Sequence, residues 1–237
     1  MENRFFCWML FLLTLSCSDN DDNSCYPDRT VIENHENLKG IVTNSDSQCP
    51  SSLFILRTGI DPEGRAFVFD ACNLPESFET DGQPIIFSGK EYATGPLEDV
   101  CAFPFEISDI DAYASENELY GIWQLVKFTD TSTMAETVQN DKEKPIEITF
   151  YETNYNGSTT RNQFFGVFMT EGNNLILKEL NTTEVAESEW GNRFYDSLQK
   201  LYSTEEKHYL IPYSITMDTL KFEYEPSKFM VLANKRF

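Results

Sequence analysis

In the first half of the chain, short apolar runs are separated by turn sequences, a pattern typical of β-strands. Residues 61–64 (DPEG) have proline second and glycine fourth, as in a type I β-turn, so we expect a hairpin around them. A segment of about 70 residues with this pattern predicts a small β-barrel or sandwich, which needs disulfides because its core is small. The predicted strands cover residues 52–56, 66–69, 84–88 and 103–107.

In the second half, apolar and polar side chains alternate more strongly, as in β-strands. In one segment the spacing of the apolar residues changes to that of an α-helix. Residues 181–184 (NTTE) predict a helix start, because a short polar side chain can cap free backbone N–H groups and a glutamate is favourable in the first turn. The apolar residues that follow lie near one face of a helix expected over residues 184–202. These residues are Val185, Trp190, Phe194, Leu198 and Leu201. Strand patterns cover residues 119–126, 146–150, 163–170, 175–177, 209–215, 220–224 and 229–232, with a polar loop expected over 130–146.

These patterns divide the chain into two domains. A small β-rich domain with disulfides is expected over residues 38–111, and a larger domain over residues 118–237, in which a curved sheet packs on one amphipathic helix. The acidic stretch at residues 108–117 is poor in apolar side chains and is interpreted as the linker. The predicted fold class is therefore mainly β with one helix (α+β).

An apolar run near the N-terminus, residues 5–15, follows a short polar head with Arg4. Eleven helical residues reach only about 16 Å, against a hydrocarbon core of about 30 Å, so this run cannot span a bilayer. It is typical of a secretory signal peptide, here residues 1–16. The following Ser16-Cys17 resembles the lipobox of bacterial lipoproteins, which implies cleavage before Cys17 and lipidation of its sulfur. The alternative is an ordinary cleaved signal that leaves Cys17 as a thiol or disulfide partner.

The residues after Cys17 support the same location. Residues 18–24 are polar and acidic, so residues 17–37 are interpreted as a lipidated acidic tether. Such a stretch resembles the surface-export signal of Bacteroidetes lipoproteins, which implies a lipid anchor in the outer membrane and exposure at the cell surface. The alternating Asp19, Asp21 and Asn23 allow a calcium loop as an alternative, but the glycine and the distant glutamate of an EF-hand are missing.

The charge of the chain excludes one class of partner. The sequence holds 39 acidic and 18 basic residues, which give a formal net charge of −21. Nucleic-acid binding draws most of its affinity from lysine and arginine at the phosphates, so no nucleic-acid partner is expected.

The cysteines agree with export. After Cys7 and Cys17 are set aside, four of the six cysteines remain, all before residue 102, and they allow three disulfide connectivities. Cys49 and Cys101 each precede a strand-like run, so we pair them with each other and pair Cys25 with Cys72. Zinc is the rival explanation, but no C-x-x-C pair occurs and neither histidine lies in a cysteine cluster, so no metal site is predicted.

The second half contains an Asn-x-Phe-x-Gly element at Asn162, Phe164 and Gly166, with Gly121 and Trp123 in its opening strand and Thr183 before the expected helix. Together with the order of elements, these residues resemble the META domain, also called the HslJ-like lipoprotein family. The resemblance covers about half of the chain. It implies a fold and an envelope location, since members are mostly envelope proteins of unknown biochemical activity linked to stress, motility or antibiotic tolerance. The cysteines that the family places beside the Asn-x-Phe-x-Gly element and beside the threonine before the helix are absent here.

The sequence holds no catalytic motif that we recognise: no G-x-S-x-G, H-E-x-x-H, P-loop or G-x-G-x-x-G is present. His35 lies in a polar stretch and is expected to be solvated, and His208 is expected to be an ordinary histidine at a strand start. Close acidic pairs arise by chance among 39 carboxylates, so no catalytic residue and no cofactor are predicted. The sequence favours a non-catalytic binding or stress-related protein whose partner is an envelope protein, peptide or glycan. The alternatives are an envelope hydrolase or carbohydrate-active enzyme with a carboxylate site, and an inhibitor of a foreign enzyme.

Overall fold

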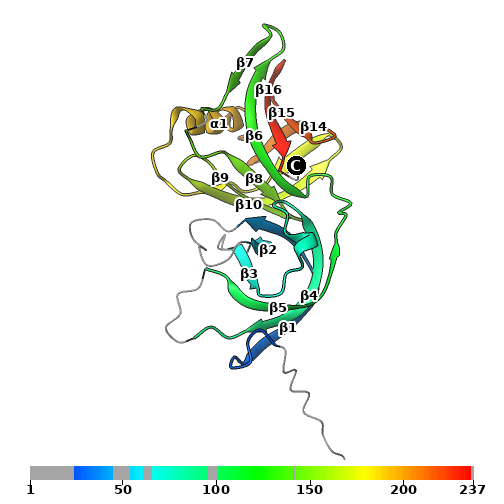
Figure 1. Ribbon diagram of the computed structural model, residues 1–237. Coiled ribbons are helices and arrows are strands. Elements are labelled where there is room, and N and C mark those ends of the chain that lie inside the picture. Colours follow the sequence, from blue (N-terminus) through cyan, green and yellow to red (C-terminus); the bar gives the residue numbers. More distant parts are fainter. Residues whose placement is uncertain (1–23, 45–53, 61–65, 96–100, 141, 236–237) are drawn as a thin grey trace, which may run out of the picture.

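The computed structural model describes residues 24–44, 54–60, 66–95, 101–140 and 142–235. Within these ranges the chain forms two closed β-barrels in succession, and a single α-helix accompanies the second (Figure 1). The prediction of a mainly β fold with one helix is confirmed. The predicted signal peptide, Cys17 and Cys49 lie outside the described residues.

The first barrel has the strand order β1-β2-β3-β5-β4. Neighbouring strands are antiparallel except β3 and β5, which are parallel. The predicted hairpin joins β2 and β3, although its turn at residues 61–64 lies outside the described residues. The elements are β1 (Val31–Asn44), β2 (Phe54–Ile60), β3 (Ala66–Ala71), a 3-10 turn η1 (Glu76–Phe78), β4 (Pro84–Tyr92) and β5 (Phe103–Ala112).

An aromatic cluster fills the first barrel. The rings of Phe69, Phe87 and Phe105 are buried, and Phe105 lies 4.8 Å from Phe69 and 5.4 Å from Phe87 between ring centroids. Ile85 and Phe87 alternate with less buried neighbours along β4, as expected for a strand with one face on the core. Gly89 lies on the same inward-facing side of β4. A Cβ atom at this position would overlap the Phe105 ring, so only glycine leaves room for the ring to pack against the strand.

The second barrel closes through β11-β10-β9-β8-β6-β16-β15-β14, because β14 also pairs with β11. Three shorter strands lie beside this ring: β7 pairs with β6, β12 with β10 and β13 with β14. The elements are β6 (Gly121–Asp130), β7 (Ala135–Val138), β8 (Glu147–Phe150), β9 (Asn154–Ser158), β10 (Gln163–Glu171), β11 (Asn174–Leu177), β12 (Asn181–Thr182), α1 (Glu189–Gln199), β13 (Tyr202–Ser203), β14 (His208–Thr216), β15 (Thr219–Glu225) and β16 (Lys228–Asn234).

Helix α1 covers the second barrel with Trp190, Phe194 and Leu198, three of the apolar residues predicted to share a face. The predicted start near residues 181–184 is wrong, because residues 181–182 form β12 and Ser188 caps the helix by accepting a hydrogen bond from the Gly191 amide. Val185, expected on the apolar face, is 56% exposed. The Asn162 side chain bonds both the N–H and the C=O of Val185, so this backbone is held by a tertiary contact and is not free to join the helix.

Several predicted boundaries also shift. Strand β1 begins at Val31, inside the predicted tether of residues 17–37, and β5 runs to Ala112, inside the predicted linker. Strand β7 lies within the predicted polar loop of residues 130–146. Most side chains in these segments are exposed on both faces of the strand. The strands are therefore formed by backbone pairing, and their sequences show no alternation of apolar and polar residues.

The two barrels contact each other through a small apolar cluster in which Ile41 of β1 packs with Tyr120, Ile122 and Tyr151. Ion pairs cross the same junction, among them Lys39 Nζ with Glu152 Oε1 at 3.0 Å. The described part of the chain contains no helix with the length and apolar character needed to cross a membrane.

Candidate functional site

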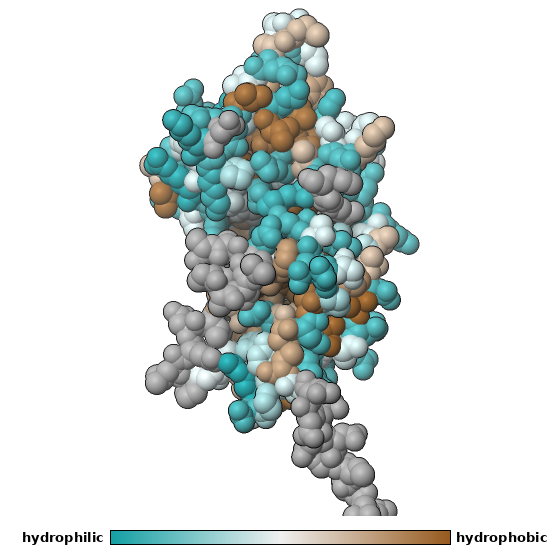
Figure 2. Space-filling model, viewed as in Figure 1, coloured by the Kyte–Doolittle hydropathy of each residue, from teal (hydrophilic) through white to brown (hydrophobic). Residues whose placement is uncertain are grey.

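The second barrel carries a cleft beside a projecting arm. Strand β6 pairs with β8 along residues 121–124 and with β7 along residues 127–130, so β6 and β7 together extend beyond the barrel rim (Figure 1). We call this extension the β6–β7 arm. A cleft of about 390 Å³ lies between the arm, helix α1 and the turn joining β15 to β16. Figure 2 shows apolar surface at the base of the arm, bordered by hydrophilic surface.

Aromatic rings form the floor of the cleft. Phe128 and Tyr224 line it, with ring centroids 6.0 Å apart, and Trp190 packs edge-on against Phe128 at 4.9 Å. Cations from helix α1 and its C-cap lie over these rings: the Arg193 guanidinium is 4.3 Å from the Phe128 centroid, and Nζ of the C-cap residue Lys200 is 5.3 Å from that of Tyr224. Each cation is therefore attracted by the electron-rich face of a ring.

The charges of the cleft are balanced, whereas the chain as a whole is strongly acidic. Three basic residues, Arg193, Lys200 and Lys228, line the cleft together with three acidic residues. Glu225 Oε1 lies 3.1 Å from Lys200 Nζ, and Glu225 Oε2 lies 2.6 Å from Lys228 Nζ. Hydrogen bonds from Lys228 and then Lys200 lower the pKa of Glu225.

A second group of polar side chains lies at one end of the first barrel. Glu33 and His35 on β1 meet Glu91 on β4, with one ligand atom from each residue within 4.8 Å of the others. We call these three residues the barrel-end cluster. His35 is not the solvated residue that the sequence predicted, because its side chain is 15% exposed and its ring lies 5.5 Å from Phe69 and 5.9 Å from Phe105.

The two histidines have different surroundings. His35 Nε2 lies 2.8 Å from Glu91 Oε2, and both side chains are largely buried. His208 begins β14 as predicted and lies 2.9 Å from Glu206 Oε2, but that glutamate is 59% exposed. Glu33, His35 and Glu91 are the group of described residues that could hold a metal ion.

A third group of polar side chains lies beneath the start of helix α1 and joins two residues of the META resemblance. Thr183 Oγ1 donates to Asn162 Oδ1 at 2.9 Å, and Asn162 Nδ2 donates to Glu187 Oε1 at 2.6 Å. Burial raises the pKa of Glu187, but hydrogen bonds from Thr159, Thr160 and Asn162 outweigh it and lower that pKa overall. These contacts hold the chain before the helix in place, which is a structural role.

The other residues of the resemblance also occupy structural positions. Trp123 is buried in β6 and donates from Nε1 to the Leu119 carbonyl at 2.7 Å. Gly121 begins β6 with a φ of 134°, in the region that favours glycine. Phe164 is buried in β10, and a Cβ at Gly166 would overlap the Glu179 carbonyl.

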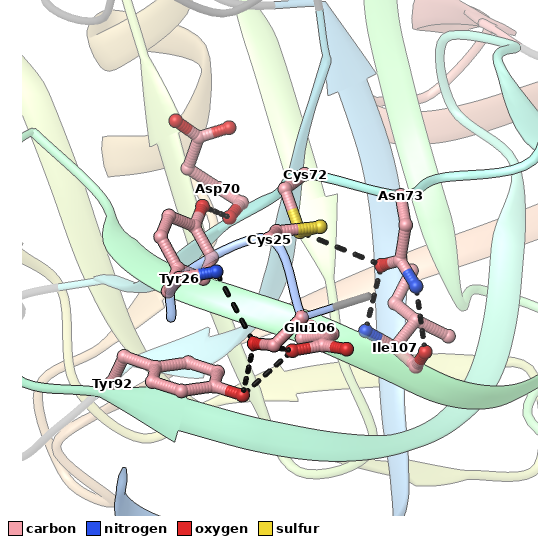
Figure 3. The surroundings of a disulfide bond; sticks show 9 residues. Cys25, Tyr26, Asp70, Cys72, Asn73, Tyr92, Glu106 and Ile107 are labelled. Carbon is pink, nitrogen blue, oxygen red and sulfur yellow. Dashed lines mark hydrogen bonds between the residues drawn. A yellow bond between two sulfur atoms is a disulfide. The ribbon is translucent and has the colours of Figure 1, made fainter. Parts of the chain in front are cut away.

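Cys25 and Cys72 form the disulfide predicted for them (Figure 3). The bond fixes the segment before β1 to the chain after β3, and Ser24 Oγ adds a hydrogen bond of 2.8 Å to Glu106. Glu106 also accepts from the Tyr92 hydroxyl at 2.6 Å. Cys101 is likewise disulfide-bonded; its predicted partner, Cys49, lies outside the described residues.

Comparison of the chain with protein-family models, with curated proteins and with solved structures finds no match. The META resemblance therefore stays a prediction. The geometry of the described residues is the remaining guide to function.

Sequence reasoning missed both the cleft and the barrel-end cluster. Arg193 on helix α1 and Lys200 at its C-cap are seven positions apart, about two helical turns along the same side, which is a signal that could have drawn attention to them. Their partners come from the β6–β7 arm and the β15–β16 turn, and no local pattern joins these segments. In the barrel-end cluster, Glu33 and His35 share a strand face two positions apart, but Glu91 is brought to them only by the pairing of β1 with β4.

Proposed function

We propose that the protein is a lipid-anchored protein of the bacterial envelope with a non-catalytic binding role, and that it binds its ligand in the cleft beside the β6–β7 arm. The observation that carries the proposal is the placement of two cations over an aromatic floor in an otherwise acidic molecule. Such a surface suits a ligand that combines a carboxylate or other acidic group with a flat or apolar face, as acidic peptides and acidic glycans do.

The acidic residues of the cleft favour binding over hydrolysis. A glycosidase needs one carboxylic acid whose pKa is raised, so that it can protonate the leaving group. The lysine hydrogen bonds lower the pKa of Glu225, and hydrogen bonds from Ser132 and then Thr133 outweigh burial and lower that of Asp130. Both groups are thus held ionised, which suits the pairing of charges in a binding site.

The lipid anchor rests on the N-terminal sequence. The predicted signal peptide, residues 1–16, ends directly before Cys17, and a lipid on the Cys17 sulfur would hold the acidic molecule on the outer membrane, since each buried methylene contributes about 0.8 kcal/mol. Protease shaving of intact cells measures exposure at the surface. Cys17→Ala should move the protein into the soluble fraction, and membrane retention of this variant after its signal peptide has been cleaved would contradict the anchor.

Capture of partners from intact cells tests the binding role. The wild-type protein should retain a partner that the double variant Arg193→Glu, Lys200→Glu loses, because charge reversal repels an acidic ligand. Lys142→Glu combined with Lys178→Glu is the matched control, since both lysines are exposed and neither lines the cleft. Equal recovery of the partner with both double variants would contradict the cleft as the binding site. A turnover that one acidic or histidine substitution abolishes would contradict the non-catalytic role.

A further inference from the structure

We propose that the barrel-end cluster, Glu33, His35 and Glu91, binds a divalent transition-metal ion such as Zn²⁺. This site is separate from the cleft of the second barrel and does not depend on the proposed binding role. Imidazole nitrogen and carboxylate oxygen are both zinc ligands, and three protein ligands leave the fourth position of a tetrahedral ion to water. The imidazole favours Zn²⁺ over Ca²⁺ and Mg²⁺, which prefer oxygen ligands alone.

The distances suit such an ion. Two ligands at about 2.1 Å from a tetrahedral ion lie roughly 3.4 Å apart. His35 Nε2 lies 2.8 Å from Glu91 Oε2 and 4.0 Å from Glu33 Oε2, so the observed separations fall on both sides of that value. Glu33 has a 64% exposed side chain and can move by the small distance required.

The strand register supplies an independent reason for a cation. Glu33 and Glu91 are directly paired residues of β1 and β4, and like charges in such positions repel each other. Within the described part of the chain, neither glutamate forms an ion pair with lysine or arginine, and the His35 imidazole lies within 4.0 Å of both carboxylates. A divalent ion bound between them would neutralise both carboxylates.

The barrel also fixes the ligands in position. Irregularities in the β1–β4 pairing lie on each side of the segment from Glu33 to His35, and the His35 ring rests on Phe69 and Phe105. Glu91 follows Gly89 on the inward-facing row of β4, and its side chain is 14% exposed. Two of the three ligands are therefore held by packing, and the third, Glu33, lies on the solvent-exposed side of the site.

Calorimetric titration of the full chain with Zn²⁺ tests the proposal. Cys7→Ser and Cys17→Ser are included in every variant, so that only the four cysteines predicted to be disulfide-bonded remain. The parent protein should bind one Zn²⁺ at this site, and His35→Gln, Glu91→Gln and Glu33→Gln should each weaken that binding at least about tenfold. An excess of Ca²⁺ should not displace the zinc.

His208→Gln is the matched control, because His208 is the other histidine of the chain and has its own glutamate partner at the surface. Its zinc affinity should equal that of the parent. Should the largely buried His35 and Glu91 variants fail to fold, the exposed Glu33→Gln still decides the question, and Zn²⁺ should raise the thermal unfolding midpoint of the parent but not of this variant. The proposal is overturned if the parent binds no zinc, or if Glu33→Gln and His208→Gln bind it as the parent does.

Discussion

At the scale of single residues, Asn162 connects the chain before β10 to residues 183–187, the segment that leads into helix α1. Its side chain is buried, and its amide donates to the Val185 carbonyl and to Glu187 while its oxygen accepts from the Val185 amide and Thr183. All four hydrogen-bonding positions of the side-chain amide are thus used. Neighbouring sequence does not reveal this, because the partners lie more than 20 positions away.

Asn162→Ala should reduce the free energy of unfolding by about 1–3 kcal/mol, since the substitution leaves buried polar groups without partners. Urea unfolding at neutral pH measures the loss. Asn192→Ala, at an exposed position of helix α1, is the control and should change stability by less than about 0.5 kcal/mol. Equal losses in the two variants would show that the Asn162 contacts contribute nothing.

Glu187 should make stability depend on pH. Its pKa is lowered in the folded protein, so its ionised form contributes stability at pH values above the unfolded pKa of about 4.3, and this contribution is lost as the pH falls through the folded pKa. Glu187→Gln should therefore be less stable than the wild type at neutral pH, and the difference should shrink in acid. Urea midpoints of both proteins across this range measure it, and a difference that does not change with pH would refute the assignment.

At the scale of secondary structure, the sequence predicts strands well where one face is buried and poorly where both faces are exposed. Strand β4 shows the expected alternation directly over residues 85–89, because its inward residues form part of the core. Strand β7 and the first part of β1 are exposed and are formed by pairing with partners elsewhere in the chain. The helix start was misplaced because capping residues occur both at residues 181–183 and at Ser188, and only the tertiary contacts of Asn162 decide between them.

Ser188→Ala should cost about 1 kcal/mol of stability, because Ser188 is the residue that caps helix α1. Thr182→Ala removes a residue of the start that the sequence predicted and should cost less, since Thr182 is exposed and caps no helix. Thermal and urea unfolding of both variants measure the difference. A larger loss with Thr182→Ala would favour the earlier helix start.

At the scale of the whole molecule, the two barrels differ in how they are stabilised. All six cysteines precede residue 102, so the second barrel depends on its larger core, whereas the disulfide from Cys25 to Cys72 spans 47 positions in the first. Cysteine spacing in the sequence predicts this division. The cleft and the barrel-end cluster could not be predicted in the same way, because each combines side chains from strands or turns that are distant in the chain.

Replacing both Cys25 and Cys72 by alanine should lower the stability of the first barrel by about 2–4 kcal/mol, because the unfolded chain is no longer constrained by this bond. Hydrogen exchange resolved by residue should show faster exchange in β1 to β5. Strands β6 to β16 serve as the internal control and should exchange as in the wild type. Faster exchange confined to the second barrel would contradict the prediction that the Cys25–Cys72 disulfide stabilises the first barrel.

The disulfide between Cys25 and Cys72 determines where a force on the N-terminus would act on the protein. Only seven residues separate Cys25 from Cys17, so with Cys17 embedded in a bilayer the chain between them could extend by no more than about 28 Å. A force on the anchor would then be transmitted to the first barrel at the Cys25–Cys72 disulfide. It would act on both the segment before β1 and the chain after β3, which this bond joins. The second barrel, at the opposite end of the molecule from this point of attachment, would carry its cleft outward from the headgroups and within reach of molecules in the surrounding fluid (Figure 1).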